Sequence, residues 1–105
     1  MKVLFVGNLR HLGDSDVFSG AGTELRVLPL DGLDEGEVDQ FMPDVIATPL
    51  FSDTFDCYDV GARLSAAEFT GQFVLVTGSL PHPESVLGEV ARLFPTLDVE
   101  LFQTG

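Results

Sequence analysis

The 105-residue sequence holds a single cysteine, Cys57, so no disulfide can form within the chain. Basic residues are also scarce, because 5 Lys and Arg stand against 17 Asp and Glu and give a net charge of -12. A surface of that sign repels nucleic-acid phosphates and anionic lipid heads, so neither nucleic acid nor membrane is an expected partner. The apolar run at Met1 to Val6 is too short for a signal peptide, and no run approaches transmembrane length. These absences predict a cytoplasmic protein.

Apolar residues make up 45% of the chain, which suits one packed core in a single domain, residues 1–105. The clearest element is the run Phe73-Val74-Leu75-Val76-Thr77 between two glycines. It predicts a strand that is buried on both faces. A strand of this kind needs cover above and below, which favours a parallel sheet with crossover helices.

The rest of the chain alternates between strand-like and helix-like patterns. Further strands are predicted at residues 3–6, 24–30, 45–48 and 99–102, with Pro29 placing the second at a sheet edge. Helical spacing appears at residues 38–42, 60–67 and 86–94, whereas the glycine-rich segment 9–22 predicts only a short helix or a long loop. In the first of these helices Val38, Phe41 and Met42 share one apolar face. This order predicts βαβ units and a doubly wound, flavodoxin-like α/β fold of five parallel strands in the order 2-1-3-4-5.

The segment from Tyr58 to Gly78, YDVGARLSAAEFTGQFVLVTG, resembles the third helix and fourth strand of response-regulator receiver domains. In that family the helix ends in a phrase such as L-x-x-x-x-F-x-G, and an apolar strand ending in Thr or Ser follows. Lys2 to Asn8 resembles the first receiver strand, and Pro43 to Ile46 resembles the entry to the third. The resemblance implies a receiver-like regulatory domain of two-component signal transduction.

The residues expected in the receiver phosphorylation pocket are nevertheless missing. Gly7 and Asn8 stand where receivers carry two Mg²⁺-binding acids. The place of the phosphate-accepting Asp falls at Pro49 or, one residue away, at Thr48, and the best counterpart of the Lys is Gln103. Only Thr77 matches the family. An aspartyl phosphate requires a carboxylate nucleophile and cations beside the transferring oxygens. The sequence therefore predicts a degenerate receiver, or pseudo-receiver, that is not phosphorylated, is not an enzyme and uses no cofactor.

The architecture also departs from the family, because the sequence ends at the fifth strand and the final receiver helix is missing. We therefore expect one face of the sheet to be poorly covered, and such an apolar patch commonly marks an interaction surface. Its predicted cover is a protein partner or a second copy of the chain, as a homodimer. The resemblance further implies a contact surface near the fourth helix, at Pro81, His82, Pro83, Val86 and Val90.

The acidic loop residues and Cys57 suggest two other kinds of chemistry. Acidic residues in the loops after the first and third strands could hold a divalent cation or a small ligand, which is the alternative function; these are Asp14, Asp16, Asp53, Asp56 and Asp59. A solvated acidic rim explains the same residues. Cys57 could act as a nucleophile with His11 or His82, but its acidic neighbours disfavour the thiolate.

Overall fold

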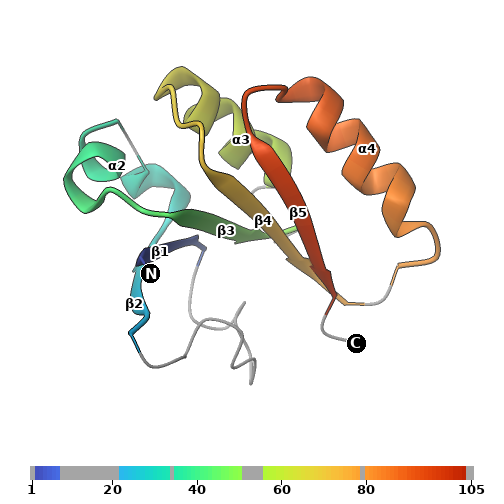
Figure 1. Ribbon diagram of the computed structural model, residues 1–105, viewed down its shortest axis with the longest axis horizontal. Coiled ribbons are helices and arrows are strands. Elements are labelled where there is room, and N and C mark those ends of the chain that lie inside the picture. Colours follow the sequence, from blue (N-terminus) through green and yellow to red (C-terminus); the bar gives the residue numbers. More distant parts are fainter. Residues whose placement is uncertain (1, 8–21, 34, 51–55, 79, 104–105) are drawn as a thin grey trace.

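The computed structural model describes residues 2–7, 22–33, 35–50, 56–78 and 80–103. Within them a single sheet of five parallel strands has the order β2-β1-β3-β4-β5, with helices alongside (Figure 1). This confirms the predicted flavodoxin-like α/β arrangement. The strands are β1 (Lys2–Val6), β2 (Glu24–Leu28), β3 (Val45–Pro49), β4 (Gln72–Thr77) and β5 (Asp98–Gln103). The helices are the short 3₁₀ turn η1 (Leu30–Gly32), α2 (Glu35–Phe41), α3 (Cys57–Ala66) and α4 (Pro83–Leu93).

Strand β4 lies between β3 and β5, and its four central residues, 73–76, are buried. Because side chains alternate along a strand, Phe73 and Leu75 point to one face and Val74 and Val76 to the other. Each pair belongs to a separate apolar cluster, one on each side of the sheet. The prediction of a strand buried on both faces is therefore confirmed.

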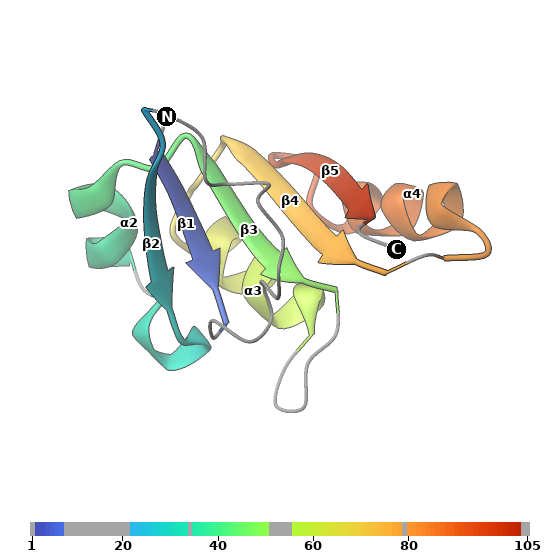
Figure 2. The same cartoon turned by 90° about the horizontal axis from the view of Figure 1, so that it is seen from below.

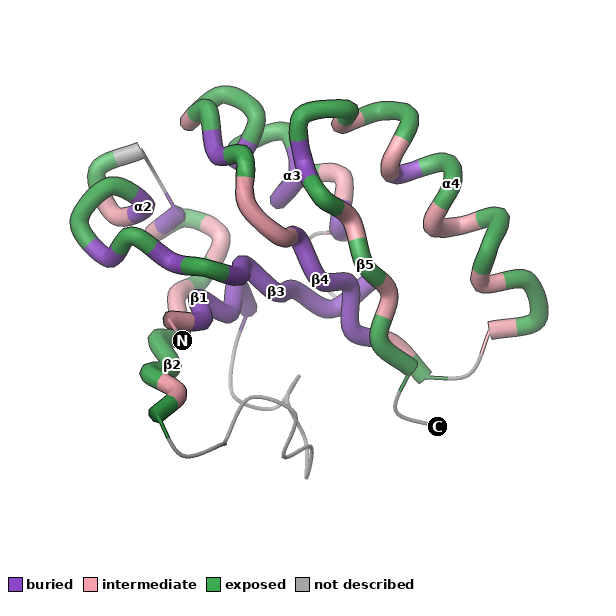
Figure 3. The backbone as a smooth tube through the Cα atoms, viewed as in Figure 1, coloured by how far each residue is buried: buried purple, intermediate pink, exposed green. Residues whose placement is uncertain are grey.

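The larger of the two cores lies between the sheet and the helices. Figures 1 and 2 show α2, α3 and α4 on the same side of the sheet. They contribute the buried side chains Val38 and Phe41 from α2, Val60 and Leu64 from α3, and Val90 from α4. Full burial of an apolar side chain of this size contributes roughly 1.5–3 kcal/mol. Figure 3 shows that the buried residues concentrate in β1, β3 and β4, with isolated buried positions on the inner sides of the helices.

The opposite face of the sheet carries a second apolar cluster, formed by Val3, Phe5, Val45, Ala47, Val74 and Val76. None of the helices in the described part of the chain packs on this face. Even so, each of these side chains is at most 9% exposed. The expectation of a poorly covered face is therefore wrong for its centre. Only the margins are open, at Leu25 of β2 (39% exposed) and Phe102 of β5 (37% exposed).

The ends of one helix and one strand differ from the predicted boundaries. Met42 does not lie on the apolar face of α2, because the helix ends at Phe41 and Met42 adopts a left-handed φ of 51° with 72% of its surface exposed. Strand β3 does not stop before Pro49 but includes it. A proline is tolerated there because the neighbouring carbonyls have other donors. The Thr48 hydroxyl donates to the Val6 carbonyl of β1 over 3.0 Å, and the Leu50 N–H donates to the Val76 carbonyl of β4 over 2.9 Å.

Strand β5 runs to Gln103, and within the described residues no helix follows it. The face that a final helix would cover in a receiver therefore has no helical layer in the part of the chain that is described. No helix formed by the described residues is long and apolar enough to cross a membrane.

Candidate functional site

The candidate site is the edge of the sheet where the parallel strands end, since ligands of open α/β sheets bind at this edge. Gly7 directly follows β1, and β3 ends at Pro49, β4 at Thr77 and β5 at Gln103. The structure therefore places four of the five predicted pocket residues at ends of adjacent strands. Asn8, the fifth, lies outside the described residues.

Gly7 is held by the backbone at the end of β1. Its N–H donates to the carbonyl of Leu28 over 2.8 Å, and its φ of 144° belongs to the region that residues with side chains rarely adopt. The residue is also buried. An Asp at this position, as in a receiver, would be strained in this conformation.

The end of β3 offers no nucleophile. Pro49 is buried and has no reactive side-chain atom. The preceding Thr48 is 0% exposed, and its hydroxyl donates to the backbone carbonyl of Val6 over 3.0 Å. That hydroxyl therefore fastens β3 to β1 beneath the edge and is not available to a ligand.

The Gln103 side chain also has a structural role. Its side-chain Oε1 accepts a hydrogen bond from the N–H of Leu80 over 3.1 Å. The bond joins the end of β5 to the loop between β4 and α4. Thr77, the last residue of β4, is half-buried and is paired with Gln103 in the sheet. A neutral amide thus lies where the resemblance to receivers predicted a lysine counterpart, and it holds a loop.

Asp56 and Asp59, two of the five predicted metal-ligand candidates, lie at the start of helix α3, where Asp56 is the cap. Its Oδ1 accepts from the N–H groups of Tyr58 (3.0 Å) and Asp59 (3.1 Å), and Asp59 Oδ2 accepts from the N–H of Asp56 (3.0 Å). This reciprocal capping box stabilises the helix start. Among the described residues, no three His, Cys, Asp or Glu side chains are grouped to hold a metal. The other candidates, Asp14, Asp16 and Asp53, lie outside the described residues.

Cys57 is the first residue of α3 and points into the helix-side core, where its side chain is 0% exposed. Burial and, to a smaller extent, the Asp56 charge raise the pKa of its thiol from 9.0 to about 11. The thiol is therefore protonated at neutral pH, as expected of a packing cysteine. His82 is exposed in the loop before α4, and His11 lies outside the described residues.

The predicted contact surface before and along α4 is only partly a surface. Pro81 and His82 are exposed and Pro83 is half-buried. Val90 is 0% exposed and belongs to the core, and Val86 packs against that core. Including Val90 was wrong, because the same spacing that makes the helix amphipathic turns this residue towards the sheet.

Sequence reasoning missed the close contact between α3 and α4. Burial and the Glu89 carboxylate, which is also its hydrogen-bond partner, raise the pKa of the Tyr58 hydroxyl. Nearby, the ring of Phe94 lies so close to Gly61 that an added Cβ would be 2.5 Å from it. The available signal was a glycine within a helical pattern, which often marks close packing.

Comparison with known proteins leaves the family open. No protein-family model and no curated protein matches the chain. Among solved structures, the chain is similar to the Streptococcus pneumonia TIGR4 flavodoxin, with 12% sequence identity and a TM-score of 0.47. That match covers 95% of this chain and 77% of the flavodoxin.

Proposed function

We propose that this chain is a non-catalytic, receiver-like regulatory module that does not accept phosphate and acts in signal transduction by binding another protein. The observation that carries the proposal is the chemistry of the strand ends, where Gly7, Pro49, Thr77 and Gln103 supply neither a carboxylate nor a cation. Phosphoryl transfer to a protein side chain needs a nucleophile and positive charge at the transferring oxygens.

The polar groups that do occur near this edge support the same reading. The Thr48 hydroxyl and the Gln103 amide both form hydrogen bonds within the fold, and Asp56 caps α3. Groups engaged in this way position backbone and are poor ligands for a substrate. The scaffold of the fold is thus retained while the described part of the edge lacks reactive groups.

A protein is the partner class that the charge favours. The net charge of -12 opposes binding to nucleic acid or to an anionic membrane, whereas it attracts a basic protein surface. The chain would then work by presenting a surface, and its regulation would come from the availability of the partner.

The test is exposure to phosphodonors. The chain is incubated with acetyl phosphate and Mg²⁺, and separately with beryllofluoride and Mg²⁺, beside a phosphorylatable receiver as the positive control. We expect no phosphoryl adduct by mass spectrometry and no change in backbone amide shifts. An adduct that disappears in Asp44→Asn or Asp53→Asn would refute the proposal.

Titration with Mg²⁺ alone separates the alternative, a small-ligand or divalent-metal protein that uses the acidic loops. Saturable amide shifts that vanish in Asp53→Asn would support the alternative. The matched control is Asp39→Asn, because Asp39 is exposed on α2 and belongs to none of the acidic loops.

A further inference from the structure

In the described residues, the outer edge of β5 is open to pairing with a further strand. Strand β5 pairs with β4 in parallel along its full length, from Gln72–Asp98 to Thr77–Gln103. Across the described part of the chain, no strand pairs with its other side. An edge strand presents N–H and C=O groups that can hydrogen-bond to an added strand.

The hydrogen bonding of Asp98 shows which amides face outward. The Asp98 N–H donates to the carbonyl of Gly71, at the start of β4, over 3.2 Å. Because backbone groups alternate in direction along a strand, the N–H groups of Glu100 and Phe102 also face β4. Those of Val99, Leu101 and Gln103 face away from the sheet.

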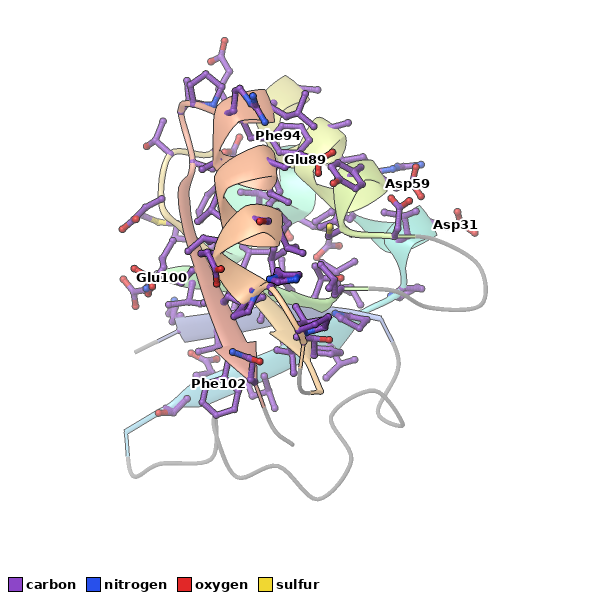
Figure 4. The ribbon with its side chains drawn as sticks, turned by 90° about the vertical axis from the view of Figure 1, so that its right-hand side faces the viewer. Asp31, Asp59, Glu89, Phe94, Glu100 and Phe102 are labelled. Carbon is purple, nitrogen blue, oxygen red and sulfur yellow. The ribbon has the colours of Figure 1, made fainter. Side chains whose placement is uncertain are left out.

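The side chains of β5 divide between two environments. Val99 and Leu101 pack against the helix-side core, whereas Asp98, Glu100 and Phe102 are exposed on the opposite face. Figure 4 shows Glu100 and Phe102 projecting from the same side of β5, away from α4. The strand contains no proline and no lysine, which are common protections of an edge. Its acidic residues are the remaining protection.

The charged residues of β5 are all acidic, whereas the other edge strand, β2, carries both signs of charge. It carries both Glu24 and Arg26, and Arg26 Nη1 lies 3.6 Å from Glu37 Oε2 of α2. Pro29 follows directly after the strand. A partner of one charge sign therefore gains more at β5 than at β2.

A second copy of the chain is a poor occupant of the β5 edge. Pairing two β5 strands into one continuous sheet would place Asp98 and Glu100 of each copy on the same face as those of the other. Like charges on neighbouring strands are destabilising, and each copy also carries a net charge of -12. The occupant that complements this edge is a cationic strand.

We propose that the outer edge of β5 receives an extended segment of another protein in which Lys or Arg alternates with apolar residues. The inference rests on the proposed protein-binding function and names its site and the chemistry of its partner. The cationic side chains lie beside Asp98, Glu100 and Phe102, and the apolar ones lie beside Val99 and Leu101. Backbone bonds to the outward amides supply the affinity, and the charges select the partner.

The test uses the full chain and a short, end-blocked peptide in which Lys alternates with Val. Amide hydrogen exchange is followed by NMR. In the free chain we expect Glu100 and Phe102 to exchange slowly and Val99, Leu101 and Gln103 to exchange fast. The peptide should slow exchange at the three outward amides by about tenfold or more, which would abolish the alternation.

Charge reversal tests the selectivity. A peptide that alternates Glu with Val should bind about tenfold or more weakly, because two attractive pairs become repulsive. The variant Asp98→Lys/Glu100→Lys should prefer the Glu peptide. The variant Asp39→Lys/Glu84→Lys makes the same change in net charge at exposed helix positions and should keep the preference for the Lys peptide.

Each failure has a separate meaning. Protection or shift changes confined to β2 or α4, or no binding of the Lys peptide, would overturn the β5 inference and leave the proposed function standing. Equal binding of both peptides would also overturn it, because the acids would then have no selective role. A phosphoryl adduct in the phosphodonor experiment would refute the proposed function instead.

Discussion

The contact between α3 and α4 makes a sharp prediction for Gly61. This glycine is buried within α3, and a Cβ built on it would meet three ring atoms of Phe94 at 2.5, 2.7 and 2.9 Å. Carbon atoms in contact prefer about 3.5–4.0 Å, so in Gly61→Ala the ring must move by about 1 Å. Phe94 caps the end of α4 and is partly buried against the core, which limits that movement.

Two opposing effects set the magnitude. Replacing a helical glycine by alanine stabilises by roughly 0.5–1 kcal/mol. Overpacking of a filled contact costs roughly 1–3 kcal/mol. We therefore expect Gly61→Ala to destabilise the fold by about 0.5–2 kcal/mol, which corresponds to a fall in melting temperature of several degrees, at about 4–8 °C per kcal/mol.

Gly88→Ala is the matched control. Gly88 lies within α4, is exposed, and has no atom within 4 Å of its built Cβ, so the propensity term acts alone. This variant should gain roughly 0.5–1 kcal/mol. Urea denaturation followed by circular dichroism measures both variants. If Gly61→Ala is stabilised as much as Gly88→Ala, the Phe94 ring does not pack on Gly61.

In addition, Phe94→Leu should cost less in the Gly61→Ala background than alone, because the two residues are in contact.

Three further predictions follow from the polar groups near the strand ends. Thr48→Val should cost about 1 kcal/mol in urea denaturation, because the buried carbonyl of Val6 loses its donor; no change would mean that water replaces the hydroxyl. Asp56→Ala should cost about 0.5–2 kcal/mol through loss of the α3 cap, measured in the same way; an unchanged midpoint would contradict the capping box. Cys57 should resist thiol reagents until the chain unfolds. Because the pKa of its thiol is raised from 9.0 to about 11 by burial, the unfolded chain loses this proton first and stability should fall as pH rises from 9.0 to about 11. In Cys57→Ala that part of the pH dependence should vanish.

Much of the fold could be predicted because its elements have strong local signals. β4 is a continuous apolar run between two glycines, and the apolar residues of α4 recur with helical spacing. The strand order required the additional rule that alternating strands and helices build a doubly wound sheet. The boundaries were less accurate, because Met42 and Pro49 depend on backbone conformation and pairing partners, which the pattern of apolar residues does not encode.

For the candidate site, the sequence predicted which residue types stand at the strand ends but not which contacts they make. The sequence shows that Pro49 and Gln103 cannot act as the receiver Asp and Lys. It does not show that Gln103 holds the N–H of Leu80, because that bond spans 23 residues. The contact surface was placed on Val90 because the resemblance to receivers implied it, whereas the apolar stripe of α4 turns Val90 towards the sheet, where it is buried.

The hydrogen bonds at the strand ends also bear on where recognition takes place. If the Thr48 hydroxyl proton or the Gln103 Oε1 exchanged its bond within the fold for one to a ligand, a backbone group would lose its partner. The outward amides of β5 face no such cost, because in the described chain no strand pairs with them. A partner strand there replaces hydrogen bonds to water and breaks no strand pairing of the described chain. Of these two places, the lateral edge of the sheet is therefore the less costly for binding, and the acids beside Phe102 restrict the partner to a cationic one.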